Sequence, residues 1–219
     1  MSEFSESRRK FNEPASNIMQ NPSISCNRQC STPEIDESAC IHPMAAIIGD
    51  VTIGPKVMVS PYACIRADEG TPFLIDEMSN VQDGVVIHAL EAADQQGNPI
   101  EERLVEYEGN KYAVYVGKRV SLAHQSQVHG PAYIGDDTFI AMQSLVFNAR
   151  VGKGCVLEPK SGVIGVSIPD GRYVPAGVVI TDQKSADSLP EIYDGYPYIN
   201  TNKAVVKVNI DLAEGYMRE

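Results

Sequence analysis

The chain has 219 residues, 43% of them hydrophobic, which is enough to bury the core of one domain. Its 18 basic residues stand against 29 acidic residues, and the net charge of −11 argues against nucleic acid or an anionic membrane as a partner. No apolar run approaches the ~18 residues that a membrane-spanning helix needs.

Residues 1–33 are rich in Ser, Asn, Gln and Pro and lack the apolar segment of a secretory signal. We therefore expect a mobile N-terminal arm. The five cysteines form neither a zinc-knuckle spacing nor a disulfide framework, which indicates a reducing compartment. A cytoplasmic protein is expected, although an exported form whose leader had been removed would have the same sequence.

From residue 34 to residue 182, aliphatic residues recur at every sixth position. The clearest rows are Ile41, Ile47, Ile53, Val59 and Ile65, then Ile75, Val81 and Ile87, then Val116, Leu122, Val128, Ile134, Ile140 and Val146. This hexapeptide pattern predicts an all-β solenoid, a parallel β-helix in which each hexad forms one side of a triangular prism. Three hexads make one coil, and the pattern predicts about seven coils stacked about 4.8 Å apart.

Two segments interrupt or follow the repeat. Residues 89–114 are polar and rich in acids, with a Gly97-Asn98-Pro99 turn, and we expect an excursion loop that returns as a hairpin. Residues 183–219 predict a short helix and then a C-terminal α-helix near 201–217, packed on the outside of the prism.

The repeat fixes where two of the four histidines point. Once the excursion is removed, Ile87 and Val128 are one coil apart, so His88 and His129 should be neighbours on one outward face. The same count, allowing for a four-residue insertion, places Arg66 one coil earlier on that face.

His124 belongs to a different face of the prism, with Asp83 one coil below it. His42 lies on that second face but about three coils away, so we assign it no metal role. A single prism does not easily bring His124 to His88 and His129, whereas a neighbouring prism does. A three-fold assembly would give three equivalent sites between subunits, each with three imidazoles and an open position, which is the ligand set of a catalytic zinc site.

The segments around these histidines carry specific motifs: IRADEG at 65–70, NVQDGVVIH at 80–88 and SLAHQSQVHGPA at 121–132. Together they resemble the γ-class carbonic anhydrases, in particular the archaeal branch with an acidic loop after the first histidine. The resemblance extends from about residue 34 to the C-terminus. It implies a left-handed β-helix, a homotrimer, a metal at each subunit interface and reversible hydration of carbon dioxide to bicarbonate and a proton.

The resemblance also implies roles for single residues. Glu69 would hydrogen-bond the water at the metal, Glu91 would carry the proton out, Gln82 would orient the hydroxide nucleophile, and Asn209 would hold substrate or bicarbonate. Ion pairs of Arg66 with Asp68 or Asp83 would cross between subunits. The three histidines suit Zn(II) first, and Fe(II) or Co(II) as well.

The chain departs from the family at two positions. Cys26 stands where we expect an aromatic residue in the N-terminal arm, and Lys207 stands where a tyrosine would precede Asn209 by two positions. These departures would affect the alignment of carbon dioxide in the site and the rate at which protons leave it.

Two other functions stay open. Many hexapeptide-repeat trimers are acyltransferases that use a coenzyme A thioester, but they need one catalytic histidine and a groove for pantetheine rather than three converging histidines. A γ-class-like subunit kept as a silent scaffold would be indicated by loss of the ligands or of the acidic loop. Both are intact in this sequence.

Overall fold

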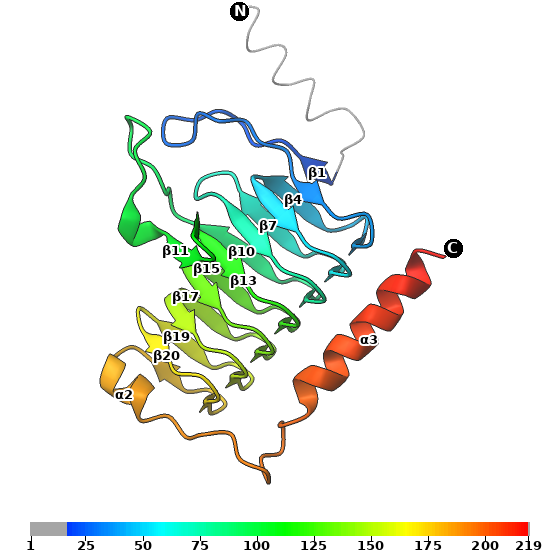
Figure 1. Ribbon diagram of the computed structural model, residues 1–219, viewed down its shortest axis with the longest axis vertical. Helices are drawn as coiled ribbons and strands as arrows, with labels where there is room; N and C mark the ends of the chain where they lie inside the picture. The colour runs from blue at the N-terminus through cyan, green and yellow to red at the C-terminus, as the bar shows by residue number, and fades with distance from the viewer. Residues whose placement is uncertain (1–16, 219) are drawn as a thin grey trace, which may run out of the picture.

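The six-residue repeat folds into a three-sided, left-handed parallel β-helix whose coils stack along one axis (Figure 1). The computed structural model describes residues 17–218. The first face consists of β2 (Glu34–Ile35), β5 (Val51–Ile53), β8 (Phe73–Ile75), β13 (Val114–Val116), the second halves of β15 (Gln127–Ile134) and β17 (Leu145–Val151), and β20 (Ser167–Ile168).

The strands of the other two faces also stack in chain order along the prism axis. The second face consists of β3 (Cys40–Ile41), β6 (Met58–Val59), β9 (Asn80–Val81), β14 (Ser121–Leu122), β16 (Phe139–Ile140), β18 (Val156–Leu157) and β21 (Tyr173–Val174). The third face consists of β1 (Ile18–Met19), β4 (Ala46–Gly49), β7 (Cys64–Ala67), β10 (Val86–Ala89), the first halves of β15 and β17, β19 (Gly162–Ile164) and β22 (Val179–Ile180).

The third face has one rung, that is, one strand in the stack, more than the sequence predicts. Seven of its rungs come from the hexad rows, and β1 adds another by pairing Ile18 with Ile47. The prism therefore has about eight turns rather than seven. The parallel register joins Ile18, Ile47, Ile65, Ile87, Val128, Val146, Val163 and Ile180.

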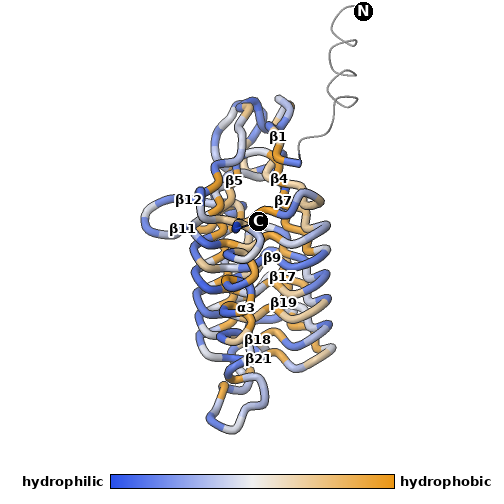
Figure 2. The backbone as a smooth tube through the Cα atoms, turned by 90° about the vertical axis from the view of Figure 1, so that its right-hand side faces the viewer, coloured by the Kyte–Doolittle hydropathy of each residue, from blue (hydrophilic) through white to orange (hydrophobic). Residues whose placement is uncertain are grey.

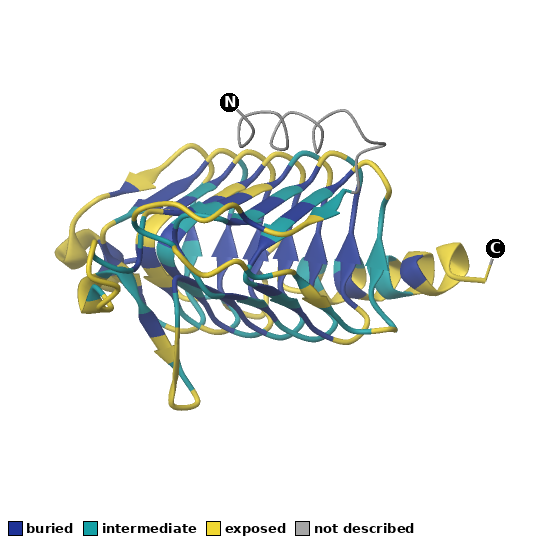
Figure 3. Cartoon of the chain, turned by 90° about the horizontal axis from the view of Figure 1, so that it is seen from above, coloured by how far each residue is buried: buried dark blue, intermediate teal, exposed yellow. Residues whose placement is uncertain are grey.

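The core is the set of aliphatic rows that defines the repeat. Ile47, Ile65, Ile87 and Leu122 are fully buried, so each coil packs on the next with apolar side chains. Figure 2 shows these hydrophobic positions gathered on the strands, while Figure 3 shows the exposed residues at the corners and at the protruding hairpin.

The corners of the prism use left-handed backbone conformations. Successive coils place a residue of positive φ at equivalent turns, for example Lys56 at 55°, Met78 at 59° and Arg119 at 55°. These are non-glycine residues, and the ladder hydrogen bonds on both sides hold them there: Met78 N donates to Pro55 O at 2.9 Å, and Arg119 N to Glu77 O at 3.0 Å.

The excursion forms a separate lobe on the prism. After β10 the chain makes η1 (Glu101–Arg103) and then the hairpin of β11 (Val105–Tyr107) and β12 (Asn110–Tyr112) before it rejoins the repeat at β13. The ring of Tyr107 stacks on the buried Tyr115 with centroids 4.0 Å apart, which fixes the hairpin against the first face.

The C-terminal segment contains α2 (Gln183–Asp187) and α3 (Thr201–Tyr216). Asp182 caps α2 by accepting a hydrogen bond from Ser185 N at 2.9 Å. Figure 1 shows α3 running back along the stack, where it contacts β3, β6 and β14 of the second face. No helix within residues 17–218 has the length and the apolar content needed to span a bilayer.

The segment 17–33, predicted as part of a mobile arm, lies against the molecule. Besides the pairing of β1 with β4, Asn27 Nδ2 donates to Asp68 O at 3.2 Å and Arg28 Nη2 to Gln95 O at 3.0 Å. These polar contacts use backbone acceptors, which explains why a segment of low hydropathy packs here. Residues 1–16 of the predicted arm lie outside the described residues.

Candidate metal centre

His88 and His129 form a stacked pair on the third face. β10 and β15 pair in parallel with His88 opposite His129, and the two ring centroids are 5.4 Å apart. Because Ile87 and Val128 point into the core, the alternation of a strand turns both imidazoles outward. This is the neighbouring pair that the hexad count predicts.

The imidazole of His129 has a fixed tautomer. Its Nδ1 lies 3.1 Å from Gly130 O, and a carbonyl oxygen only accepts hydrogen bonds, so Nδ1 carries the hydrogen. The lone pair of Nε2 is then free to bind a metal. A backbone carbonyl on the far nitrogen is a common partner of metal-binding histidines.

His124 is oriented by Asp83 at the corner between the second and third faces, in the turns that follow β14 and β9. Its Nδ1 donates to Asp83 Oδ2 at 3.0 Å. The two residues lie one coil apart, as predicted, because Gln125 N, next to His124, donates to Asp83 O. The side chain of His124 is 57% exposed, so most of the imidazole surface is open to solvent in a single chain. A carboxylate in this position fixes the tautomer of the imidazole, with the hydrogen on Nδ1.

His88 Nε2 is buried and has no hydrogen-bond partner within the described residues. It lies 3.4 Å from Asp68 Oδ1 and 3.6 Å from Glu69 Oε2. Burial, with a smaller contribution from the nearby Arg66 cation, lowers the pKa of His88 below its usual value. The ring is therefore neutral at physiological pH, as a metal ligand must be.

The three imidazoles fit a divalent metal by their chemistry. His124 and His129 each have one nitrogen held by an acceptor and the other free, and the orphaned His88 Nε2 needs a partner. Within residues 17–218 of one chain, no three His, Cys, Asp or Glu side chains converge closely enough to hold a metal. His124 thus stays apart from the pair in a single prism, in agreement with the geometry predicted from the hexads.

A buried hydrogen-bond chain holds Gln82 directly after β9 of the second face. Gln82 Nε2 donates to Asn80 Oδ1 at 2.9 Å, and Asn80 Nδ2 donates to Ser121 Oγ at 2.9 Å. All three residues are buried, which fixes the orientation of the Gln82 amide. Asn80 stands in the quoted motif, but sequence reasoning gave it no role.

The charged residues predicted to pair between subunits have partners within one chain. Arg66 Nη1 lies 3.2 Å from Asp68 Oδ2, whereas Asp83 contacts His124. Their pairing across subunits stays a prediction. Asn209 lies half-buried on α3, the helix that packs over the second face, and its Nδ2 donates to Val205 O at 2.9 Å.

Glu91, the predicted proton carrier, is bound to a residue that sequence reasoning missed. Its Oε1 lies 2.6 Å from Arg103 Nη1, which also donates to Glu91 O at 2.9 Å. This hydrogen-bonded guanidinium lowers the pKa of the Glu91 carboxyl, and the neighbouring Glu69 side chain adds a small contribution of the same sign. The sequence does contain a sign of this pairing, because Arg103 is the one basic residue from 89 to 110, among six acidic residues.

The two departures from the family lie at separate places. Cys26 borders a cleft of about 290 Å³ between the segment 17–33 and the excursion loop, together with Thr71, Ala92 and Lys111. Lys207 is exposed on α3 and pairs with Asp211 at 2.5 Å.

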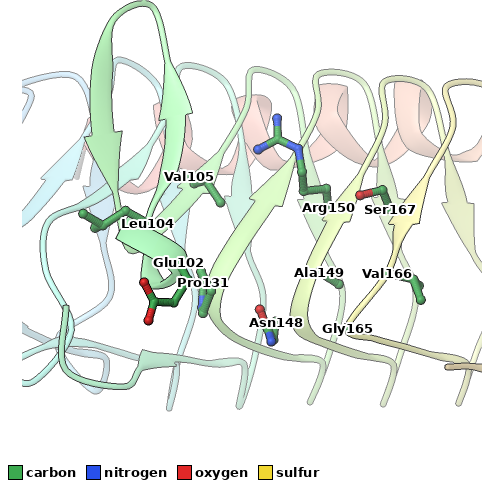
Figure 4. Close-up of a pocket in the computed structure, with 10 residues that line it drawn as sticks. All are labelled: Glu102, Leu104, Val105, Pro131, Asn148, Ala149, Arg150, Gly165, Val166 and Ser167. Carbon is green, nitrogen blue, oxygen red and sulfur yellow. The ribbon is translucent and has the colours of Figure 1, made fainter. Parts of the chain in front are cut away.

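A second cleft, of about 200 Å³, lies under the excursion loop and contains none of the histidines (Figure 4). Glu102 and Leu104 from the loop face Asn148 and Arg150 of β17 across it. The guanidinium of Arg150 is already placed over the ring of Tyr133, 4.1 Å from its centroid. The cleft is open and separate from the histidine pair.

Comparison with known proteins adds a close relative. No protein-family model matches the chain. A carbonic anhydrase from Methanosarcina thermophila is 61% identical over 201 residues, which cover 92% of this chain and 81% of that protein. The carboxysome assembly protein CcmM from Nostoc is 48% identical over 78% of this chain, but the match spans only 29% of that protein.

Two solved structures share the fold at low identity. A Bacillus cereus protein described as an acetyltransferase has a TM-score of 0.69 and 21% identity, covering 92% of this chain and 98% of that one. A hexapeptide transferase family protein from Anaplasma phagocytophilum has a TM-score of 0.63 and 24% identity, covering 85% and 93%. At this identity the likeness concerns the hexapeptide-repeat fold alone.

Proposed function

The chain belongs to the γ-class carbonic anhydrases, and on that premise we propose that it hydrates carbon dioxide reversibly at a divalent metal shared between the subunits of a homotrimer. The enzyme class rests on the 61% identity to a carbonic anhydrase over nearly the whole chain, and a relative of this kind implies a metal cofactor. The single observation that carries the proposed site is the outward His88–His129 pair, in which the buried His88 Nε2 has no hydrogen-bond partner within residues 17–218.

In the proposed site His88 and His129 of one subunit face His124 of the next, with Nε2 as the donor atom of His124 and of His129. These three imidazoles would hold a divalent metal, which when bound would lower the pKa of water to about 7 and so make water a nucleophile at neutral pH. We assign it as Zn(II), with Fe(II) or Co(II) as alternatives that three imidazoles also bind. An assembly with three-fold symmetry closes this head-to-tail contact into a ring.

The remaining residues act on water, substrate and proton. Glu69, at 3.6 Å from His88 Nε2, accepts the hydrogen bond of the attacking water. Gln82, locked by Asn80, directs its free amide atoms at the same water, and Asn209 holds carbon dioxide or bicarbonate. The proton released from water passes to the Glu91 carboxylate and from there to buffer.

The proposal is tested by metal analysis of anaerobically purified protein, with stopped-flow measurement of carbon dioxide hydration on the same sample. We expect about one divalent metal per chain, loss of activity on chelation, and recovery on adding Zn(II), Co(II) or Fe(II). Light scattering at micromolar concentration should give the mass of a trimer. An active, metal-loaded monomer would overturn the shared site.

Replacing Glu91 by Ala removes the proposed proton carrier. We expect kcat in weak buffer to fall by about 10²-fold, the lower end of general acid–base contributions, while kcat/KM stays within about twofold. Imidazole in the assay should restore kcat because it carries the proton directly. An equal loss of kcat and kcat/KM without rescue would remove Glu91 from this role, and Glu106→Ala, on the exposed hairpin, is the matched control.

A role in assembly is the second candidate, favoured by the 48% identity to CcmM over 171 residues. The chain matches less than a third of that protein, so the likeness concerns one region of it. A metal-free trimer without hydration activity would favour assembly over catalysis.

A further inference from the structure

Resting on the proposed role of Glu91, we infer that Arg103 is a positioning residue that restrains the Glu91 carboxylate and thereby slows the export of the proton. The restraint is a clamp with two contacts. One guanidinium nitrogen, Nη1, contacts both Oε1 of Glu91 at 2.6 Å and its main-chain oxygen at 2.9 Å. The side chain of Glu91 is therefore tied to a point on the opposite arm of the loop.

The loop brings Arg103 to this point by its own hydrogen bonds. Ile100 N donates to Ala92 O at 2.8 Å, and an antiparallel bridge joins Ala93 to Pro99, so the two arms of the loop run side by side. Arg103 ends η1, and one residue, Leu104, separates it from β11.

The position of Arg103 is rigid because the following hairpin is anchored on the prism. Tyr107 of β11 stacks on Tyr115, which is fully buried, and Val105 is buried under the hairpin. Glu91 lies two residues past the end of β10, at the start of the loop. The ion pair thus ties the Glu91 side chain to the arm of the loop that the hairpin anchors.

No other cation of the loop competes for Glu91. Arg103 is the one basic residue from 89 to 110, and the next one, Lys111, is paired with Glu101 at 2.6 Å. Both partners of the clamp are about one-third exposed, at 30% for Arg103 and 34% for Glu91, so the ion pair is accessible to salt.

Two consequences of the clamp act in the same direction. A carboxylate that carries protons must turn between the water at the active site and the solvent, and a tethered one turns only when the pair opens. The guanidinium also stabilises the anionic form, in keeping with the lowered pKa of Glu91, which makes the carboxylate a weaker proton acceptor. Losing the clamp should therefore speed the proton-export step and leave carbon dioxide binding unchanged.

The test compares Arg103→Gln with wild type in the metal-loaded trimer. In weak buffer we expect kcat of Arg103→Gln to rise about two- to fivefold, the range set by the modest strength of exposed ion pairs, with kcat/KM unchanged. Arg103→Lys, which keeps the charge, should stay near wild type. Arg119→Gln breaks the exposed ion pair with Asp137 at a distant corner and should change nothing.

A second measurement needs no variant. Adding an inert salt at constant weak buffer should raise wild-type kcat relative to Arg103→Gln, because screening opens the ion pair. In saturating imidazole the two proteins should have the same kcat. Two results together would overturn the restraint. The kcat of Arg103→Gln in weak buffer would be equal to or below that of wild type, and the kcat of wild type would not change with salt.

The Glu91→Ala variant separates this inference from the function on which it rests. If Glu91→Ala leaves kcat in weak buffer unchanged, the proton-carrier role of Glu91 fails, and the role of Arg103 fails with it. If Glu91→Ala lowers kcat and Arg103→Gln does not raise it, only the restraint fails. In the double variant Glu91→Ala/Arg103→Gln, the loss of Arg103 should have no further effect.

Discussion

His124→Ala is expected to abolish metal binding and carbon dioxide hydration while the β-helix stays folded. The imidazole of His124 is exposed and hydrogen-bonds to Asp83, so its removal opens no cavity in the core. The proposed site loses one of three ligands. We expect hydration to fall by more than about 100-fold, the upper end of what loss of a residue behind a ligand costs. Metal analysis and stopped-flow hydration measure both effects.

His42→Ala is the matched control for this prediction. His42 follows β3 at the same corner of the prism, about three coils from His124, and its Nδ1 accepts a hydrogen bond from Met44 N at 3.1 Å. The variant should retain metal and activity. If His124→Ala behaves like His42→Ala, the site between subunits is wrong.

Mixing two inactive variants tests whether the ligands come from different subunits. A His124→Ala chain still offers His88 and His129, and a His88→Ala chain still offers His124. In a head-to-tail ring, each mixed trimer has one interface with all three ligands, so random mixing should restore about a quarter of wild-type activity. A site built within one chain would stay inactive in every mixture.

The hexad rows predicted the fold because they carry the packing energy. Ile65, Ile87 and Val128 are buried and in parallel register, and that register follows from counting in sixes. The same count placed His88 beside His129, since a side chain directly after a core position must point outward. Because the repeat is periodic, a shift of the register by one residue would have turned the aliphatic side chains of every row toward solvent.

Contacts outside the repeat could not be counted in this way. β1 joins the third face through main-chain hydrogen bonds, and nothing in the composition of residues 17–33 marks Ile18 as a partner of Ile47. The pairing of Arg103 with Glu91 depends on how a loop folds back on itself, twelve residues apart. Neither contact follows from the six-residue repeat, so neither could be predicted from the sequence.

Gly70→Ala is the second substitution for which we expect a large effect, and it acts on the start of the excursion loop. A Cβ on Gly70 would lie 2.1 Å from Leu90 O and 2.6 Å from Ala89 Cβ. Its backbone φ lies outside the left-handed region, so the glycine is required by close approach rather than by conformation. The loop passes over Glu69–Gly70 at this point, and Gly70 N donates to Ala89 O at 3.2 Å.

The substitution must push the loop outward, because both atoms in its way belong to the chain that leads into Glu91. Overpacking of this kind costs about 1–3 kcal/mol, and backbone contact puts Gly70→Ala at the upper end, measured as a lower urea midpoint. The displaced Glu91 should also lose its place beside Glu69, so kcat in weak buffer falls and imidazole restores it.

Gly215→Ala separates this contact from the general effect of removing a glycine. Gly215 lies in α3 with nothing within 4 Å of the added Cβ, so alanine there should raise the helix stability by up to about 1 kcal/mol and leave kcat unchanged. Gly70→Ala with an unchanged urea midpoint and unchanged buffer dependence would show that the loop tolerates the displacement, and that the approach of Leu90 does not set the position of Glu91. Retained metal content would in either case show that the histidine face tolerates a displaced loop, because His88 is fixed by the ladder of β10 and not by the chain that follows it.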